Sequence, residues 1–477
     1  MTDIRFGTDG WRALIADEFT FQNVARCAQG LCAYLKEVGT AGQGLVVGYD
    51  TRFLSPEFAE TVAAVCSAQG IKVFLANKPA PTPVLSYNVL HHQAAGAAII
   101  TASHNPSQWN GFKFKPEYAG SATQEITDQL EESIARAAVP AETGAHSVAE
   151  GRASGLIVDL DPTPPYMDRI ASLVDLDAIR GAGLDVVVDS MYGAGGGYLP
   201  ALLEGGKTTV RELHGHRNPA FPGMEQPEPI AHNLTEISSL IAQEAPNDGA
   251  TVGIALDGDA DRVGIIDEQG RFVTTLDTFS ILAQYLLEQK QQRGALVKGV
   301  TSSIALNKLG EAYGVDVHEM RVGFKNIGPK MTEVDALMAG EESGGFAFRG
   351  HIPERDGILS GLYFLEYMAT TGDSPTQLLQ RLVSKVGPHH YHRRDIRFQA
   401  ADRERILQSL NNPGLTEIAG FRILDSDTID GRRFHLEDGW LAVRFSGTEP
   451  LLRIYAEAAT PEMVTRLLDW AMEYLGV

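Results

Sequence analysis

A hydroxyl, an imidazole and a lysine lie close together in the segment "TASHNPSQWNGFK" (101–113). The segment follows the apolar run "AAGAAII" (94–100), which is typical of a buried strand. Asn-Pro and Asn-Gly dipeptides within it predict turns. The chain is therefore expected to leave its core and at once present Ser103, His104 and Lys113 on a tight loop. This arrangement suits a nucleophile with helper groups, and the alternative is an ordinary polar hairpin.

Three aspartates alternate with small residues in "VGIALDGDADRVGII" (252–266), at Asp257, Asp259 and Asp261. Carboxylates at this spacing repel one another unless a cation lies among them. Oxygen ligands favour Mg²⁺, Mn²⁺ or Ca²⁺ over Zn²⁺. A calcium-binding EF-hand loop is excluded, because Arg262 stands where that loop needs glycine and strands are expected on both sides. The alternative to a metal site is a solvated acidic turn.

Two further segments carry groups that suit a phosphorylated sugar. "RFSGTEPLLR" (444–453) has a Ser-Gly-Thr turn between two arginines, and hydroxyls, free N–H groups and guanidinium forks suit a phosphate. "GEESGGFAF" (340–348) places Glu341, Glu342 and Ser343 among glycines, where they could accept hydrogen bonds from sugar hydroxyls. Taken alone, the first segment could be a hairpin with surface arginines and the second a glycine-rich turn.

Other segments are less specific. "FGTDGWRA" (6–13) and "RVGFKNIG" (321–328) each place a cation beside glycines, and such surface cations are usually just solvated. "YGAGGGY" (192–198) has Tyr198 where a dinucleotide-binding loop needs its last glycine, so it predicts only the start of a helix. The histidines of "PHHYHRR" (388–394) lack further ligands at metal-binding spacing and are predicted to lie in a linker.

The elements that must position these residues follow one plan in three segments, 44–70, 184–203 and 295–314. Each has a short apolar strand, a polar or glycine-rich loop and then a helical pattern. This plan predicts βαβ units around largely parallel sheets, which bind ligands at the carboxyl ends of their strands. The end of the chain differs, because 421–458 alternates like antiparallel strands and 461–477 is amphipathic. A small α+β domain is expected there.

The composition is that of an ordinary globular protein of 477 residues, with 44% hydrophobic and 21% charged residues. This length predicts about three or four domains, with candidate linkers near 139–165 and 386–395. The net charge of −21 argues against a nucleic-acid partner but allows a local cluster that binds a small anion. The three cysteines, Cys27, Cys32 and Cys66, form no CxxC pair, which indicates a reduced cytoplasmic protein. The polar N-terminus and the absence of long apolar runs predict neither a signal peptide nor a membrane span.

In this order along the chain, the motifs are similar to those of the α-D-phosphohexomutase superfamily, which includes phosphoglucomutases, phosphomannomutases and phosphoglucosamine mutases. The resemblance runs from "FGTDGWRA" to "RFSGTEPLLR". It implies an α/β fold in which three similar mixed-sheet α/β domains and a C-terminal α+β domain surround a central cleft. The expected domains are a phosphoserine-loop domain (1–150), a metal-binding-loop domain (156–270), a sugar-binding-loop domain (271–385) and a phosphate-binding domain (390–477).

The resemblance also implies roles for individual residues. Ser103 would be the phosphoserine, and its phosphate would join Asp257, Asp259 and Asp261 as ligands of Mg²⁺. The catalytic residues would be Ser103 with Arg12, His104 and Lys113. The substrate-binding residues would be Lys325, Glu341, Ser343, Arg444, Ser446, Gly447, Thr448, Arg453 and Arg262.

The implied activity is the interconversion of glucose 1-phosphate and glucose 6-phosphate through a phosphoserine enzyme and glucose 1,6-bisphosphate, which would also be the activator. The "GEES" run resembles that of glucose-preferring members, whereas Gly345 stands where some mannose-handling members and the glucosamine mutases have histidine. The alternatives are a phosphomannomutase, a phosphoglucosamine mutase or a glucose 1,6-bisphosphate synthase. A non-catalytic sugar-phosphate binder is disfavoured, because a binder needs neither Ser103 nor the three aspartates. The protein is expected to be a cytoplasmic monomer or homodimer without nucleic-acid or membrane partners.

Overall fold

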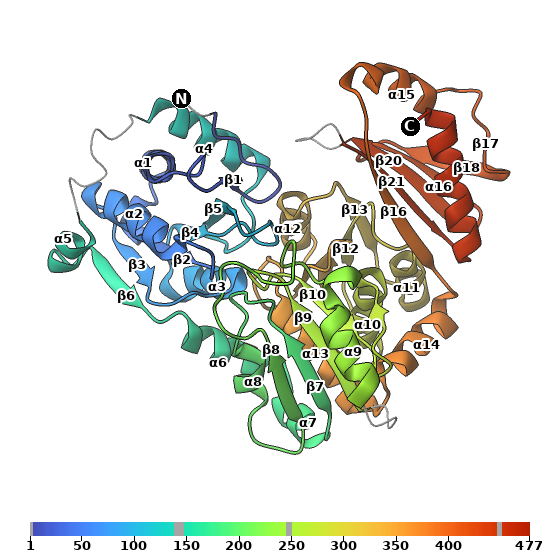
Figure 1. The fold of residues 1–477 in the computed structure, drawn as a ribbon, viewed down its shortest axis with the longest axis horizontal. Coiled ribbons are helices and arrows are strands. Elements are labelled where there is room, and N and C mark those ends of the chain that lie inside the picture. The colour runs from blue at the N-terminus through green and yellow to red at the C-terminus, as the bar shows by residue number, and fades with distance from the viewer. Residues whose placement is uncertain (1–2, 138–146, 245–249, 446–450) are drawn as a thin grey trace.

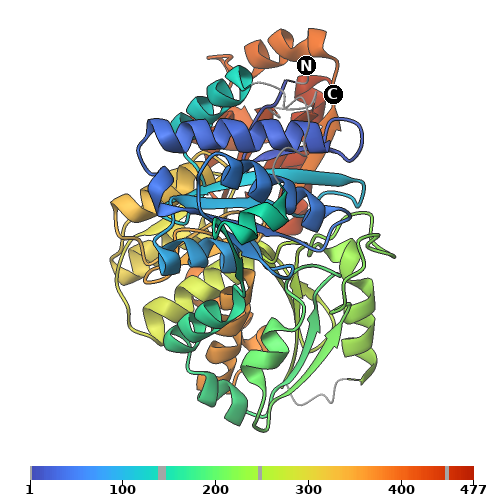
Figure 2. The same ribbon diagram turned by 90° about the vertical axis from the view of Figure 1, so that its left-hand side faces the viewer.

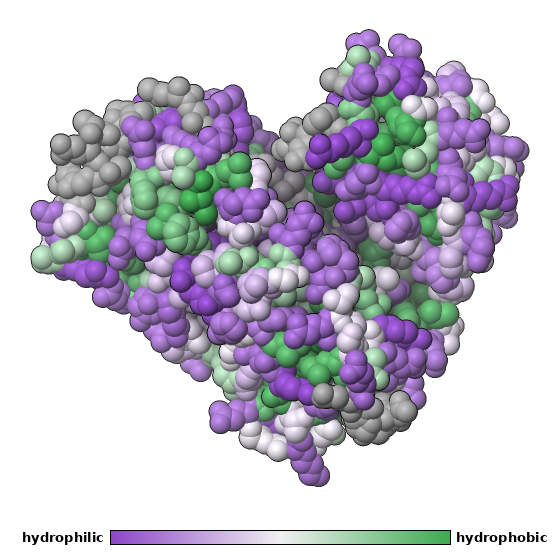
Figure 3. Space-filling view, in the orientation of Figure 1, coloured by the Kyte–Doolittle hydropathy of each residue, from purple (hydrophilic) through white to green (hydrophobic). Residues whose placement is uncertain are grey.

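The computed structural model of the protein describes residues 3–137, 147–244, 250–445 and 451–477. Four domains, each built on its own sheet, follow one another along the chain (Figure 1). The space-filling view shows a cleft, a deep notch between the first and fourth domains (Figure 3). The predicted α/β class and the four-domain arrangement are confirmed.

The first domain has a six-stranded mixed sheet. Strands β2, β3, β4 and β6 run parallel, and β5 and β1 continue the sheet beyond β4 through antiparallel pairs. In spatial order the strands are β1 (Trp11–Leu14), β5 (Trp109–Pro116), β4 (Gly96–Ile100), β2 (Leu45–Tyr49), β3 (Val73–Ala76) and β6 (Ile157–Leu160). Every residue of β2 and β4 is buried, as is usual for parallel strands covered on both faces.

Five helices belong to the same part of the chain. They are α1 (Phe21–Glu37), α2 (Ser55–Ala68), α3 (Thr82–His92), α4 (Gln124–Arg136) and α5 (Val148–Ala153). In Figure 2, which faces the first domain, α1 lies across the front and packs against α4 and α2. The predicted linker 139–165 is not only a connection, because it contains α5 and β6. The sheet of the first domain therefore includes residues beyond the predicted end at 150.

The second and third domains repeat the mixed design on smaller sheets. In the second, the spatial order is β11 (Phe272–Val273), β10 (Val263–Ile266), β9 (Thr251–Leu256), β7 (Asp185–Asp189) and β8 (Thr209–Leu213). In the third, it is β13 (Val317–Met320), β12 (Leu296–Gly299), β14 (Met338–Gly340) and β15 (Phe346–Phe348). The helices of the second domain are α6 (Thr163–Leu173), α7 (Leu176–Gly181), α8 (Tyr198–Leu203) and α9 (Thr235–Glu244). Those of the third domain are α10 (Thr275–Glu288), α11 (Ala305–Tyr313), α12 (Phe324–Glu333), α13 (Gly357–Thr371) and α14 (Pro375–Val386).

One connection recurs in all three of these sheets. A strand that runs parallel to its neighbour turns back into an antiparallel partner, as β4 turns into β5, β9 into β10 and β14 into β15. The loops that make these turns hold the serine segment, the aspartate segment and the "GEESGG" segment of the sequence. Because each loop leaves the carboxyl end of a parallel strand, the fold brings the three loops to the edges where such sheets bind ligands.

The fourth domain is the predicted α+β unit. Its six-stranded antiparallel sheet has the spatial order β16 (His390–Arg397), β21 (Leu451–Ala458), β20 (Gly439–Phe445), β19 (Arg432–Leu436), β18 (Phe421–Asp427) and β17 (Glu417–Ile418). Helix α16 (Pro461–Leu475) packs on β21 and β16, and α15 (Arg403–Leu410) packs on α16. The predicted linker 386–395 is largely strand β16.

The hydrophobic core is continuous through the first three domains, from Ile4 to Val386, whereas the fourth domain has a separate core of its own. The three cysteines are buried and unpaired by disulfides. Among the residues described, none of the helices has the length and apolarity needed to cross a membrane.

Candidate active site

Ser103 lies in the loop between β4 and β5, with its backbone in the left-handed region at φ 53°. The Thr101 hydroxyl accepts the Ser103 N–H at 2.9 Å, and the buried guanidinium of Arg52 donates to the Ser103 carbonyl at 2.6 Å. These contacts hold the serine in a conformation that non-glycine residues rarely adopt. Ser103 is only 1% exposed, so its hydroxyl is buried and is not presented to solvent as the sequence suggested.

Lys113 also differs from the prediction of a loop residue, because it lies within strand β5, opposite Ile99 of β4. The serine segment therefore combines the two alternatives that the sequence left open, a polar hairpin and a nucleophile with helper groups. It is a hairpin between β4 and β5, and it carries a hydroxyl and an ammonium group into the interior.

The aspartate loop joins β9 to β10 and touches the serine loop directly. The Ser103 hydroxyl donates a hydrogen bond of 2.9 Å to Asp257 Oδ2. The two backbones also meet, because a Cβ on Gly258 would lie 2.4 Å from the Ser103 carbonyl oxygen. The glycine-rich segment 192–198 supports this loop from behind, since a Cβ on Gly193 would lie 2.8 Å from the Gly258 carbonyl oxygen. Glycines thus serve close backbone packing here.

Asp257, Asp259 and Asp261 are each 0% exposed, and one oxygen from each lies within 4.8 Å of the others. A solvated acidic turn is excluded by this burial. In the described part of the chain, Asp259 Oδ1 and Asp261 Oδ1 are buried and accept no hydrogen bond. Orphaned buried carboxylate oxygens are costly unless a cation takes their charge. The oxygen-only donor set therefore fits Mg²⁺ or a similar hard cation.

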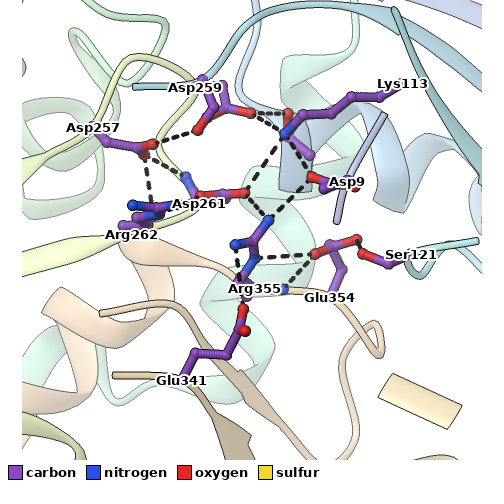
Figure 4. A network of polar contacts seen from close by, with 12 residues as sticks. Asp9, Lys113, Ser121, Asp257, Asp259, Asp261, Arg262, Glu341, Glu354 and Arg355 are labelled. Atoms are coloured by element: carbon purple, nitrogen blue, oxygen red, sulfur yellow. Dashed lines mark hydrogen bonds and ion pairs between the residues drawn. The ribbon is translucent and has the colours of Figure 1, made fainter. Parts of the chain in front are cut away.

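Lys113 neutralises part of this charge. Its ammonium group lies 2.8 Å from both Asp259 Oδ2 and Asp9 Oδ2, and 3.8 Å from Asp261 Oδ2 (Figure 4). Burial alone would lower the pKa of Lys113, but Asp259 and Asp9 outweigh it and raise that pKa above its ordinary value. Lys113 is thus a fixed positive charge at neutral pH.

The aspartates themselves respond differently to the same surroundings. Burial, followed by repulsion from Asp261 and Asp259, raises the pKa of Asp257 well above its usual value. Burial would also raise the pKa of Asp259, but Lys113 and the Thr82 hydroxyl, 2.5 Å from Asp259 Oδ2, hold that pKa below the usual range.

Arg12, His104 and Arg262 lie around the same loops. Arg12, in β1, donates to the side-chain oxygen of Asn105 at 2.6 Å, and Arg262 forms an ion pair of 2.5 Å with Glu228. The Nδ1 atom of His104 lies 3.3 Å from the Ser103 hydroxyl oxygen. Burial, followed by the nearby arginines, lowers the pKa of His104 well below its ordinary value, so its imidazole is neutral at neutral pH.

Two charged residues that the sequence analysis passed over stand at the centre of the network. Asp9 lies between the ammonium groups of Lys113 and Lys115, and Arg355 lies 2.6 Å from Asp261 and 3.1 Å from Asp9 (Figure 4). Asp9 belongs to "FGTDGWRA", whose cation alone was considered. The signal for Arg355 was the charged run "ERD" between apolar residues, just before helix α13.

The "GEESGG" loop joins β14 to β15 and reaches the same cleft. Glu341 accepts the Gly323 N–H at 2.8 Å, and burial raises its pKa above the ordinary value. Ser343 is half-buried. Glu342 faces the fourth domain with one oxygen, because its Oε1 accepts hydrogen bonds from the Tyr391 hydroxyl at 2.9 Å and from Arg393 at 3.0 Å.

Lys325 lies at the start of helix α12 and connects the third domain to the first. Its ammonium group donates to Gln124 Oε1 at 2.8 Å and to the Gly7 carbonyl at 3.3 Å. It therefore lies where "RVGFKNIG" and "FGTDGWRA" meet.

In the fourth domain, Arg444 on β20 lies directly opposite Arg453 on β21. Arg444 Nε forms an ion pair of 2.8 Å with Asp430, and Arg453 Nε lies 3.8 Å from Asp395. The predicted phosphate-binding residues Ser446, Gly447 and Thr448 lie outside the described residues.

The histidine-rich segment is structural. His389 Nδ1 lies 3.1 Å from Glu457 Oε1, at the junction of the third and fourth domains. Within the described ranges, the one group of side chains that could hold a metal is the aspartate triad.

Family descriptions match each of the four domains in turn. They are those of the phosphoglucomutase/phosphomannomutase family, α/β/α domains I, II and III over residues 3–140, 164–270 and 277–386, and the C-terminal domain over 397–473. With this order of domains and a relative of 31% identity over 98% of its length, the chain belongs to the phosphoglucomutase/phosphomannomutase family. It is accordingly an intramolecular phosphotransferase.

Individual relatives carry different sugar names. A protein of Thermococcus kodakarensis, 31% identical over 98% of each chain, is named phosphoglucomutase/phosphomannomutase. A protein of Desulforamulus reducens, 29% identical over 99% of each chain, is named phosphoglucosamine mutase. The crystal structure of a Thermus thermophilus protein, provisionally named a phosphomannomutase, superimposes with a TM-score of 0.86 and 36% identity over 100% of each chain. The relatives agree on a mutase and differ on the sugar.

Proposed function

We propose that the protein interconverts glucose 1-phosphate and glucose 6-phosphate through a phosphoserine at Ser103 and a glucose 1,6-bisphosphate intermediate. The observation that carries this proposal is the hydrogen bond of 2.9 Å from the Ser103 hydroxyl to the aspartate triad, beside the fixed charge of Lys113. A phosphoryl acceptor, a cation site and a buried positive charge are the parts that phosphoryl transfer needs.

In the first half-reaction, the free hydroxyl of the sugar monophosphate attacks the phosphorus of phospho-Ser103. The bond from phosphorus to Ser103 Oγ breaks as the bond to the sugar oxygen forms, which gives the bisphosphate. The proton of the attacking hydroxyl ends on Ser103 Oγ, and the neutral His104, 3.3 Å from that oxygen, is positioned to carry it.

Positive charge stabilises the transferring group throughout this step. Lys113 and Arg12 supply it from the chain, because Lys113 lies 2.8 Å from Asp259 and Arg12 donates to Asn105 of the serine loop. Mg²⁺ held by Asp257, Asp259, Asp261 and the phosphate of Ser103 would supply the rest of the charge that a loose phosphoryl transition state requires.

In the second half-reaction, the bisphosphate turns over in the cleft and returns its other phosphoryl group to Ser103. Arg444 and Arg453 hold the phosphate that does not react, together with the predicted turn 446–448. Lys325, Glu341, Ser343 and Arg262 orient the sugar and its phosphates. The fourth domain has its own core, so it can move relative to the other three. Such a movement would let the bisphosphate turn round inside the cleft without dissociating into solvent.

The choice of glucose is supported by the resemblance of "GEESGG" to the loops of glucose-preferring mutases and by Gly345 in place of histidine. Glu341 and Ser343 would bind the hydroxyls at carbons 3 and 4, which glucose and mannose share. Discrimination at carbon 2 must then come from neighbouring groups such as the segment 321–328. A mannose- or glucosamine-type mutase and a glucose 1,6-bisphosphate synthase are the alternatives within the same chemistry.

A coupled assay with glucose, mannose and glucosamine 1-phosphates, each with its own bisphosphate activator, tests this choice. We expect kcat/KM for glucose 1-phosphate to exceed that for mannose 1-phosphate by about tenfold to a hundredfold, the effect of one displaced buried hydroxyl. Equal or reversed values would assign the protein to the mannose or dual-specificity type. Intact-mass measurement should show a fraction that carries one extra phosphoryl group, and turnover with no such fraction would contradict the phosphoserine.

A further inference from the structure

Gly345 closes the "GEESGG" loop, and its backbone does not require glycine, because its φ lies outside the left-handed region. The space around it does require glycine. A Cβ added at this position would lie 2.2 Å from Cδ and 2.8 Å from Cγ of Arg355. The stem of Arg355 therefore occupies the volume into which any larger side chain at position 345 would grow.

The guanidinium of Arg355 contacts carboxylates from three domains. Its Nη2 atom lies 2.6 Å from Asp261 of the metal-binding loop and 3.1 Å from Asp9 of the first domain, and its Nη1 atom lies 3.5 Å from Glu341 of the sugar loop. In Figure 4 the guanidinium stands between the aspartate loop and Glu341. The side chain is buried and lies over the ring of Phe324, so it has little freedom to leave.

The contact with Asp261 has a consequence for the metal site. Asp261 Oδ2 forms an ion pair with Arg355 and Oδ1 lies 3.8 Å from Arg262 Nε, but neither oxygen accepts a hydrogen bond from the described residues. A cation bound by the three aspartates would therefore compete with the guanidinium of Arg355 for the negative charge of the Asp261 carboxylate. Like charges that share one carboxylate weaken each other's binding.

We propose that Arg355 is a positioning residue that ties the metal-binding loop to the sugar loop, and that Gly345 is glycine in order to admit it. Arg355 limits the affinity of the aspartates for the cation and in exchange holds Asp261, Asp9 and Glu341 in one arrangement. This inference rests on the proposed function, because the benefit of that arrangement is turnover of the sugar phosphate.

The test compares Arg355→Gln, Arg355→Lys, Gly345→Ala and the double variant Gly345→Ala/Arg355→Gln with the parent protein. Arg349→Gln is the matched control, since Arg349 comes from the same segment but binds the carbonyl oxygens of Arg293 and Asp335 away from the triad. Two quantities are measured on each folded protein: the affinity of the dephosphorylated form for Mn²⁺, by electron paramagnetic resonance, and kcat and KM for glucose 1-phosphate.

Arg355→Gln should bind Mn²⁺ about tenfold more tightly, because a positive charge has left the site, while kcat/KM falls about a hundredfold. A mutation that merely disordered the loops would weaken Mn²⁺ binding. Arg355→Lys keeps the charge but not the planar fork, so Mn²⁺ affinity should stay within about twofold of the parent while kcat/KM falls about tenfold. Arg349→Gln should leave both quantities within about twofold.

Gly345→Ala should displace Arg355 and lower kcat/KM in the same way. The double variant should then be no worse than the poorer single variant by more than about twofold, because both changes remove one interaction. Unchanged or weaker Mn²⁺ binding in Arg355→Gln, or additive losses in the double variant, would overturn the proposal. If Arg355→Gln does not fold, Gly345→Ala decides: tighter Mn²⁺ binding with a lower kcat/KM supports the proposal, and unchanged or weaker Mn²⁺ binding overturns it.

The metal measurement keeps this inference separate from the proposed function. A protein that shows the Mn²⁺ pattern but does not turn over glucose 1-phosphate would retain Arg355 as the link and lose the proposed sugar. A protein that turns over glucose 1-phosphate but lacks these patterns would retain the function and lose the link.

Discussion

The first three domains and the fourth domain are joined to the molecule in different ways. One hydrophobic core runs through the first three, and the serine, aspartate and sugar loops all project from it. The fourth domain has a separate core and meets the third through a small apolar contact at Trp440 and Ile304 and through buried polar groups. The reacting groups are thus fixed relative to one another, whereas the arginines of the fourth domain sit on a unit that is held by fewer and more polar contacts.

Glu457 and Arg433 show the character of that junction. Glu457 is fully buried and accepts hydrogen bonds from the Ser303 hydroxyl at 2.7 Å and from the indole of Trp440 at 2.8 Å. Arg433 donates to the Val300 carbonyl at 3.1 Å and pairs with Glu319. Directional polar contacts of this kind specify one docked position without the large apolar area that would make it permanent. The difference suits a reaction in which one end of the substrate reacts while the other is held.

The strongest test of the first three domains, which carry the reacting groups, is Ser103→Ala. Turnover should fall to the background of the assay, because the phosphoryl acceptor is lost, while the melting temperature changes by only a few degrees for the loss of one hydrogen bond to Asp257. Steady-state rates and intact mass measure the two effects. Persistent turnover, or a phosphoryl group still present on the variant, would contradict the assignment of Ser103.

The metal site should respond nearly as strongly. Asp259→Asn removes a carboxylate that binds Lys113 at 2.8 Å and is expected to lower kcat by about 10²–10³-fold and to weaken the dependence on Mg²⁺. Titration of activity with Mg²⁺ after treatment with EDTA checks this result. If the parent protein keeps full activity in EDTA, the metal assignment fails.

A substitution in the fourth domain should mainly change KM. Arg444→Ala is expected to raise KM for both glucose 1-phosphate and glucose 6-phosphate, with kcat/KM lower by about tenfold to a hundredfold for a lost charge-assisted contact. Both isomers should be affected because the two ends of the sugar exchange places in the cleft. Arg422→Ala, on an exposed position of β18, serves as the control. A defect confined to one isomer would show that the arginine does not hold the non-reacting phosphate.

The junction itself can be tested through pH. Burial alone would raise the pKa of Glu319, but Lys298, 3.1 Å away, and Arg433 outweigh it and lower that pKa from its ordinary 4.5 to about 2. A lowered folded-state pKa stabilises the protein above pH 4.5, and this stabilisation is lost as the pH falls toward 2.

Glu319→Gln should therefore destabilise the protein at pH 7 by on the order of 2 kcal/mol, with a difference that shrinks on acidification. Melting temperatures at several pH values measure it. Glu333→Gln, which removes an exposed ion pair with Lys330, should have little effect at any pH. An equal loss in both variants would mean that Glu319 contributes no more to the junction than a surface charge.

The sequence by itself determined the elements and most of the chemistry. Short apolar runs followed by helical patterns predicted βαβ units around largely parallel sheets in the first three domains, and alternation with Asp-Gly turns predicted the antiparallel strands of the fourth. Asp257, Asp259 and Asp261 could be recognised because three carboxylates crowded on one short loop repel one another and so call for a cation. These features are local, so their signal lies in consecutive residues.

Only the tertiary structure decided which charges share one site. Asp9, Arg355 and Asp261 come from three different domains and are far apart in the sequence, so no spacing rule brings them together. The burial of Ser103 and Lys113 was also invisible, because it depends on the neighbouring aspartate loop closing over the serine hairpin. Glycine at 345 looked like a missing histidine in the sequence. In the fold, the absence of a side chain at Gly345 leaves room for the stem of Arg355, whose guanidinium contacts three carboxylates. A larger side chain at position 345 would occupy the same volume as this stem.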